Sequence, residues 1–149
     1  MKNLIAFFLV LSIFGFSCIA IKDYDFHDVS GKVTFVANIQ QKYPSSVNVI
    51  ESGEKSYITA NLNQFDFLQN NLNEIYGYTL CFDNLSFEQF IKQYNVKILK
   101  TEQVQNQTVT YGYSDKFNRH IFIDNKMVNV QIVHGEYLKV GIPAILDSF

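Results

Sequence analysis

An α+β fold with an antiparallel sheet is the fold class that the sequence predicts, and three observations support it. From Val96 onward, apolar and polar side chains alternate with a period of two, which is typical of strands with one buried face. Two stretches before Val96 show the spacing of amphipathic helices. Short turn sequences join the runs, as hairpins require. We therefore expect a curved antiparallel sheet of about five to seven strands, with both helices covering one face.

The first half of the chain contains four expected strands, two of them in a hairpin. Residues 31–40 (GKVTFVANIQ) alternate as a strand does, although a helix continuing to Tyr43 is the alternative. Residues 47–62 are typical of a hairpin, because Gly53 supplies the positive φ that a tight turn favours. Residues 78–82 (YTLCF) form a short apolar strand.

Two helices are expected, one before and one after the strand at residues 78–82. The first has apolar residues at helical spacing, Asn63 as its N-cap and Gly77 as the glycine that ends it. The second begins at Ser86, where Gln89 stands three residues later and completes a capping box. It is expected to end near Asn95.

The second half of the chain reads as consecutive strands. They cover residues 96–104, 108–114, 119–124, 127–133 and 136–142. The alternation places Asn129 and Gln131 on the solvent side. A tight primed turn is expected at His134-Gly135.

The N-terminal residues resemble a secretory signal peptide. Lys2 precedes an apolar run from Leu4 to Phe16, and small residues follow at Cys18 and Ala20. The apolar run is shorter than the ~20 residues of a transmembrane helix, so we expect cleavage after Ala20. Two alternatives are an uncleaved anchor formed by residues 4–20, and acylation of Cys18. The expected organisation is then a signal peptide at 1–20, an exposed lead-in at 21–30 and one domain at 31–149.

The net charge argues against nucleic acid as a partner. The chain has a formal net charge of −2. Residues 1–20 contain one cation, Lys2, and no acid, so the charge becomes −3 without them. An acidic chain lacks the positive electrostatic field that attracts the phosphates of a nucleic acid. We expect contact with a membrane only through an uncleaved N-terminal segment.

The sequence offers few candidates for chemistry. Ser114 and His120 could form a nucleophilic site, but no G-x-S-x-G motif occurs and the surrounding residues are typical of a turn. Cys81, the only cysteine after Cys18, could act as a nucleophile with His27, His120 or His134. Its apolar neighbours instead favour a buried thiol. No metal-ligand spacing or phosphate loop occurs, so we expect no catalytic residue, metal or cofactor.

The candidate binding residues lie in the stretch YGYSDKFNRH. Tyr111 and Tyr113 share one face of an expected strand, although an aromatic stripe on a sheet more often belongs to a core. Asp115, Arg119 and His120 lie in or beside the following turn. Phe122 on the next strand could join them in a groove.

The C-terminal third resembles the YwmB-like family of small exported proteins of low-GC Gram-positive bacteria. The similarity lies in Tyr111-Gly112-Tyr113, the polar turn at 115–118, residues 125–132 and the closing Gly141-x-Pro143. The resemblance implies a fold like that of the TATA-box-binding protein, and it carries over no catalytic residue. DNA binding does not follow from the fold alone.

We therefore expect an exported, non-enzymatic binding or interaction module of the cell envelope, whose partner is a protein or an envelope component. One alternative is a small envelope hydrolase that uses the Ser114/His120 region or Cys81. Another is a structural protein anchored in the membrane by its N-terminal segment.

Overall fold

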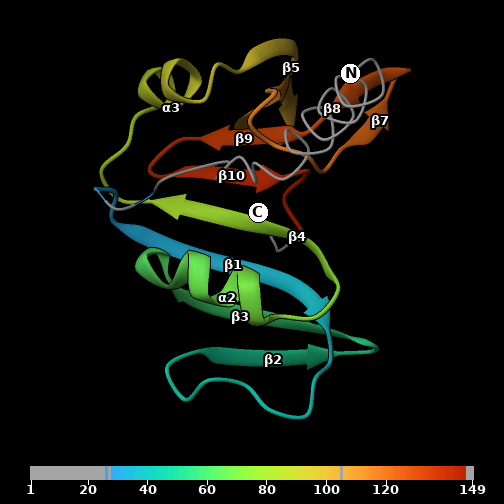
Figure 1. Cartoon of the computed structure of the whole chain (residues 1–149). Helices are drawn as coiled ribbons and strands as arrows, with labels where there is room; N and C mark the ends of the chain where they lie inside the picture. Colours follow the sequence, from blue (N-terminus) through green and yellow to red (C-terminus); the bar gives the residue numbers. More distant parts are fainter. Residues whose placement is uncertain (1–25, 27, 105, 147–149) are drawn as a thin grey trace, which may run out of the picture.

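Antiparallel strands dominate the computed structural model, which describes residues 26, 28–104 and 106–146. Eight strands form one sheet in the order β2-β3-β1-β4-β10-β9-β6-β5, and β7 and β8 form a separate ribbon (Figure 1). The strands of the sheet are β1 (Gly31–Asn38), β2 (Asn48–Ser52), β3 (Lys55–Asn61), β4 (Ile75–Phe82), β5 (Lys97–Val104), β6 (Gln107–Tyr113), β9 (Val130–His134) and β10 (Leu138–Ile142). The ribbon strands are β7 (Ile121–Ile123) and β8 (Lys126–Val128). The predicted antiparallel α+β class is confirmed, but the sheet has more strands than expected.

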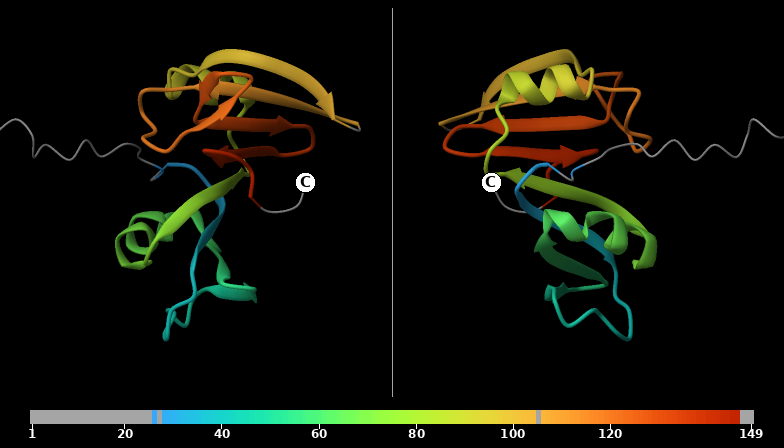
Figure 2. Two further views of the ribbon diagram at one scale, coloured as in Figure 1. Left: turned by 90° about the vertical axis from the view of Figure 1, so that its right-hand side faces the viewer. Right: turned by 60° about the vertical axis from the view of Figure 1, so that its left-hand side comes forward.

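Both helices lie on the same side of the twisted sheet (Figure 2). The first, α2 (Phe65–Asn71), follows a short 3₁₀ turn, η2 (Leu62–Gln64), and lies in front of β1 and β3 (Figure 1). The second, α3 (Phe87–Gln93), lies by the other half of the sheet. We call the side that they cover the helix face and the opposite side the open face.

The predicted boundaries of the first helix are wrong. α2 begins after Gln64, which makes no capping hydrogen bond through its side chain, so Asn63 is not the N-cap. The helix ends at Asn71, and Glu74 takes a left-handed φ of 46° before β4 begins. Gly77 lies inside β4, opposite Val36 of β1, and does not terminate a helix. Pairing with β1 overrides the helical spacing of the sequence here.

The predicted start of the second helix is confirmed. The backbone N–H of Gln89 donates to Ser86 Oγ at 3.2 Å, and the backbone N–H of Ser86 donates to Gln89 Oε1 at 2.8 Å. This capping box satisfies two backbone donors that the helix would otherwise leave unpaired. Phe90 is then buried against the sheet, and the helix ends at Gln93.

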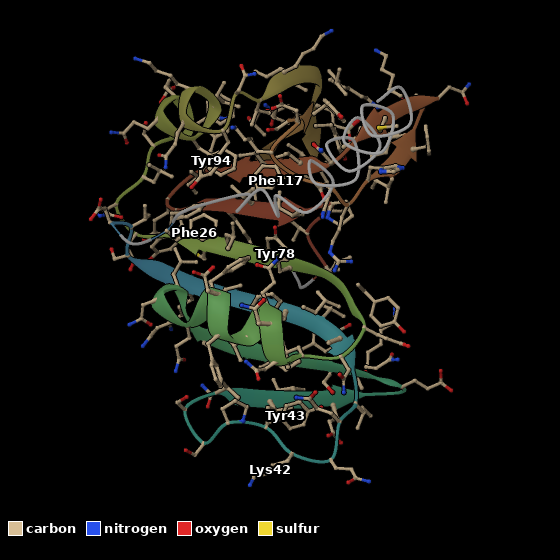
Figure 3. The ribbon with its side chains drawn as sticks, in the orientation of Figure 1. Phe26, Lys42, Tyr43, Tyr78, Tyr94 and Phe117 are labelled. Carbon is tan, nitrogen blue, oxygen red and sulfur yellow. The ribbon has the colours of Figure 1, made fainter. Side chains whose placement is uncertain are left out.

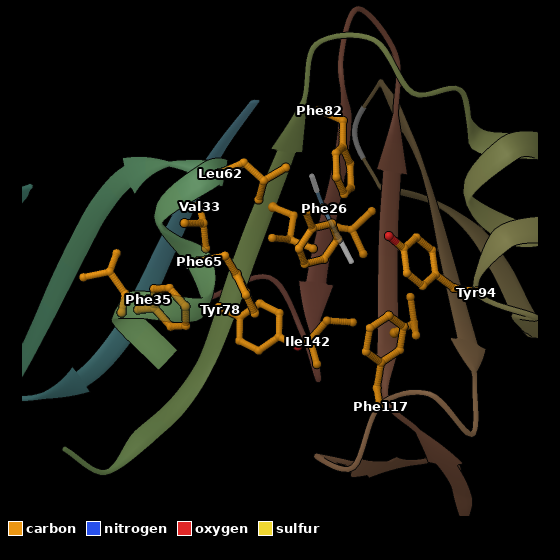
Figure 4. Packing of buried hydrophobic residues seen from close by; sticks show 14 of the residues in the cluster. Phe26, Val33, Phe35, Leu62, Phe65, Tyr78, Phe82, Tyr94, Phe117 and Ile142 are labelled. Carbon is orange, nitrogen blue, oxygen red and sulfur yellow. The ribbon is translucent and has the colours of Figure 1, made fainter. Parts of the chain in front are cut away.

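The helix face is closed by a cluster of aromatic rings (Figure 4). Phe26 lies at its centre, with ring centroids 5.0 Å from Phe65 of α2 and 6.0 Å from Tyr94, the residue that follows α3. Phe26 is only 6% exposed, so the expected exposed lead-in is wrong at this residue. Figure 3 shows Tyr43 beside β2, toward one end of the molecule, and Phe117 beside β9, closer to its middle.

The open face is partly covered by the chain after β10. The backbone N–H of Ile145 donates to Gln131 Oε1 at 2.9 Å, and that of Leu146 donates to Thr79 Oγ1 at 3.4 Å. Ile145 packs with Val109 and Val133 in a second small cluster. Gln131 does lie on the open face, but it is buried by this segment, so the predicted solvent exposure is wrong.

The observed turns agree in part with the turns predicted from the sequence. Gly53 has a φ of 61° between β2 and β3, as predicted. The two-residue turn with positive φ lies at Asp124 and Asn125, with φ of 50° and 60°. His134 instead belongs to β9 and pairs with Leu138, so the loop after it is longer than the expected primed turn.

Replacing Gly77 by alanine should lower the free energy of unfolding by about 1–3 kcal/mol through overpacking. A Cβ at Gly77 would lie 2.6 Å from the carbonyl oxygen of Ile142 and 2.8 Å from Leu146 Cδ1, so the backbone of β10 must shift. Gly135→Ala is the matched control, because no atom lies within 4 Å of its added Cβ. Urea unfolding of the two variants measures the difference, and equal stabilities would contradict the close approach of β4 and β10.

Candidate functional site

Ser114, the candidate nucleophile, is a structural residue of the turn after β6. It is buried, and its hydroxyl donates to the carbonyl oxygen of Tyr94. Ser114 Oγ also accepts the backbone N–H of Lys116 at 3.1 Å. These bonds join the end of α3 to the turn, so the hydroxyl has a packing role that the sequence pattern does not reveal.

Asn129 organises the same turn from the junction between β8 and β9. Its Nδ2 donates to the carbonyl oxygens of Ser114 at 2.6 Å and Phe117 at 2.7 Å. Its Oδ1 accepts the backbone N–H of Ser114 at 2.8 Å. Asn129 is fully buried, so its predicted place on the solvent side is wrong. The alternation breaks at this residue because the side chain serves the turn instead of the sheet.

The other polar residues of the predicted cluster do not converge on Ser114. Asp115 and His120 are exposed and Arg119 is partly exposed. The His120 ring lies edge-on to Phe122 of β7, with centroids 5.7 Å apart. Among the described contacts, none joins His120 to Ser114. The structure therefore does not assemble the Ser114/His120 pair of the hydrolase hypothesis.

Tyr111 belongs to a cluster of polar side chains on the open face of β5 and β6. Its hydroxyl donates to Glu102 Oε1 at 2.7 Å, and Lys100 Nζ lies 3.0 Å from Glu102 Oε2 and 3.2 Å from Asp124 Oδ2. Tyr113, two residues along the strand, is partly exposed.

These contacts shift the pKa values of three side chains in the polar cluster around Tyr111. The hydrogen bond from Tyr111, followed by that from Lys100, lowers the pKa of Glu102. Burial and then the bond to Glu102 raise the pKa of Tyr111, and bonds to Glu102 and Asp124 raise the pKa of Lys100. Because the pKa of Glu102 is lower in the folded chain, its stabilising contribution is lost as pH falls through that folded value.

A groove of about 300 Å³ lies beside the loop between β9 and β10. It is lined by Cys81, Gln107, Val133, Gly135, Glu136, Tyr137 and Lys139. Cys81 and Lys139 are paired across β4 and β10, and their neighbours Leu80, Phe82 and Val140 face the core, so the groove is on the open face. Of the predicted binding residues, none lines this groove. Sequence reasoning missed it because its residues come from three separate segments of the chain, at Cys81, at Gln107 and at 133–139.

Cys81 is partly exposed, so the predicted buried thiol is wrong. His134 does not join it. His134 pairs with Leu138, a core residue, and its ring stacks on Phe87 with centroids 4.6 Å apart, which places it on the helix face. The sheet therefore separates the thiol from this histidine. His120 immediately precedes β7 of the hairpin ribbon, and His27 lies outside the described residues.

Within residues 26, 28–104 and 106–146, no three histidine, cysteine or acidic side chains are grouped as metal ligands. In the same part of the chain, no helix has the length and apolarity needed to cross a bilayer.

Comparison of the chain with models of protein families, with curated proteins and with solved structures finds no match.

Replacing Asn129 by aspartate should lower the free energy of unfolding by at least about 2 kcal/mol. Aspartate keeps the oxygen that accepts the Ser114 N–H, but it loses the two N–H donors to Ser114 and Phe117. Two buried carbonyl oxygens then lack their partner, and a carboxylate faces them. Asn118→Asp makes the same chemical change at an exposed position of the same turn. Equal thermal stability of the two variants would show that the Asn129 bonds do not hold the turn.

Proposed function

We propose that the chain works outside the cytoplasmic membrane as a non-enzymatic binding module, and that the open-face groove is its binding surface. The groove carries the proposal. It is concave, its walls include the apolar side chains of Val133 and Tyr137, and a few polar groups stand among them. This composition is that of a small-ligand site.

The ligand we propose is a small anionic component of the cell envelope with an apolar body. The groove volume of about 300 Å³ is at the lower end of the range for ligand sites, which favours a small molecule over a protein surface. Lys139 supplies a positive charge in the groove, and Glu136 supplies a negative one. Lys32 is paired with Cys81 on the side away from Lys139, so a second lysine lies on the strand next to the groove.

The non-enzymatic part of the proposal is supported by the role of Ser114. Its hydroxyl is bonded to the Tyr94 carbonyl and its backbone to Asn129, so this residue has a structural reason to be present. His120 lies beside Phe122 on the ribbon. Ser114, the candidate nucleophile, is thus explained by folding.

We further propose that the chain is YwmB-like, with a fold like that of the TATA-box-binding protein. The motifs at Tyr111-Gly112-Tyr113 and Gly141-x-Pro143 support this relationship. A twisted antiparallel sheet with both helices on one side is compatible with such a fold (Figure 2).

Binding of the fluorescent anion anilinonaphthalenesulfonate tests the groove. Tyr137→Ser and Lys139→Glu should each weaken its binding about fivefold or more, because they remove an apolar wall and reverse a charge. Tyr137 is 58% exposed, so its replacement should leave the core intact. Phe122→Ser is the matched control, since Phe122 is a 66% exposed aromatic residue on the distant ribbon. The proposed groove would be wrong if all three variants bind the probe as the parent does while unfolding at the same urea concentration.

The mass of the protein released by its cells tests the proposed export. Cleavage after Ala20 predicts a chain that begins at Ile21. An intact mass that includes residues 1–20, in a membrane fraction, would favour the anchored alternative instead.

A further inference from the structure

The strand β5 forms one edge of the sheet and is long enough to pair with another strand. It is the last strand in the sheet order, and among the described residues only β6 pairs with it (Figure 1). It has eight residues, whereas β2 at the opposite edge has five. All of its side chains are at least partly exposed. The outward N–H and C=O groups of such an edge can accept a further strand.

The second part of β5, from Lys100 to Val104, is regular. A bulge interrupts the register with β6 just before Lys100, and the pairing then continues without a break to Val104. Bulges protect edge strands from association, but this one lies outside the regular segment. Within that segment, Lys100 and Glu102 lie on the open face. Thr101 lies between them on the helix face.

The charges of this segment are complementary to themselves when two copies run antiparallel. A two-fold axis perpendicular to the sheet relates the two copies, so the pairing is centred on one residue and paired residues share a face. Centring on Thr101 places Lys100 of each copy opposite Glu102 of the other. Centring on Lys100 or on Glu102 instead places like charges opposite each other. The charge pattern therefore selects the register centred on Thr101.

The contacts of Lys100 within the chain leave a donor for the second copy. Lys100 Nζ lies 3.0 Å from Glu102 Oε2 and 3.2 Å from Asp124 Oδ2. An ammonium group has three N–H donors, and the described contacts use two of them. A lysine on an edge strand usually opposes association. Here the second copy would place a carboxylate opposite it, so that the charge favours the contact.

We propose that the chain associates with a second copy of itself through β5, antiparallel and centred on Thr101, so that the two sheets join edge to edge. This interaction surface is additional to the proposed binding function and does not depend on it. The opposite edge is not the contact, because β2 carries a single charge, Glu51, and no self-pairing of it brings opposite charges together. One strand from each copy forms a small contact compared with stable interfaces, so association should depend on concentration.

Sedimentation equilibrium of the full chain over a wide range of concentrations measures the association. Lys100→Glu and Glu102→Lys should each weaken it about tenfold or more, because two attractive pairs become repulsive. An equal mixture of the two variants should associate about as tightly as the parent, because each reversed charge then faces its opposite. Recovery in the mixture also shows that both variants are folded.

Lys97→Glu is the matched control for the charge reversals. It reverses a charge on the open face of the same strand, but before the bulge and outside the regular segment. It should associate as the parent does. A dimer that is unaffected by both reversals would overturn the proposal. So would a chain that stays monomeric at every concentration, which would leave the edge to an extended segment of a different protein.

A disulfide between copies tests the register. In a chain that also carries Cys18→Ser and Cys81→Ser, Thr101→Cys should crosslink two copies on mild oxidation. The two positions are paired directly, with Cβ atoms roughly 4.5–5.5 Å apart, which suits a disulfide after a small adjustment. Gln103→Cys is the matched control on the same face of the strand. Its two copies would lie four residues apart along the strands, roughly 14 Å.

The Gln103→Cys chain should therefore crosslink about tenfold more slowly than the Thr101→Cys chain. Equal rates at the two positions would overturn the register. Failure of both to crosslink at concentrations where the parent is dimeric would overturn the contact itself.

Discussion

The fold depends on covering one wide apolar surface with two very short helices. Each helix has seven residues and is therefore about 10 Å long. Eight strands spaced as in an ordinary sheet extend over about 34 Å. The helices cannot cover this width, so aromatic side chains fill the space between them. Phe26 is central, because it contacts Phe65 on α2 and Tyr94 beside α3. The segment before the first strand is thereby part of the core.

The same constraint explains the buried polar network of the turn after β6. Phe117 closes the end of the aromatic cluster, with its ring 5.7 Å from Tyr94. The backbone that carries it runs through a turn, whose carbonyl groups need hydrogen-bond donors once they are buried. Asn129 supplies two of them, and Ser114 ties the turn to the end of α3. With the helix face occupied in this way, access to the sheet remains on the open face, where the segment after β10 covers only part.

Sequence reasoning succeeds here where the cause of structure is local. The period of two predicts the strands after Val96, and the capping box at Ser86 predicts the start of α3, because both depend on neighbouring residues. It fails where distant segments decide. Gly77 resembles a helix terminator until β1 pairs with it, and Gln131 resembles a solvent-facing residue until the chain after β10 folds across it. The pairing of Cys81 with Lys32 and with Lys139 belongs to this second class, because it follows only from the order of three strands in the sheet.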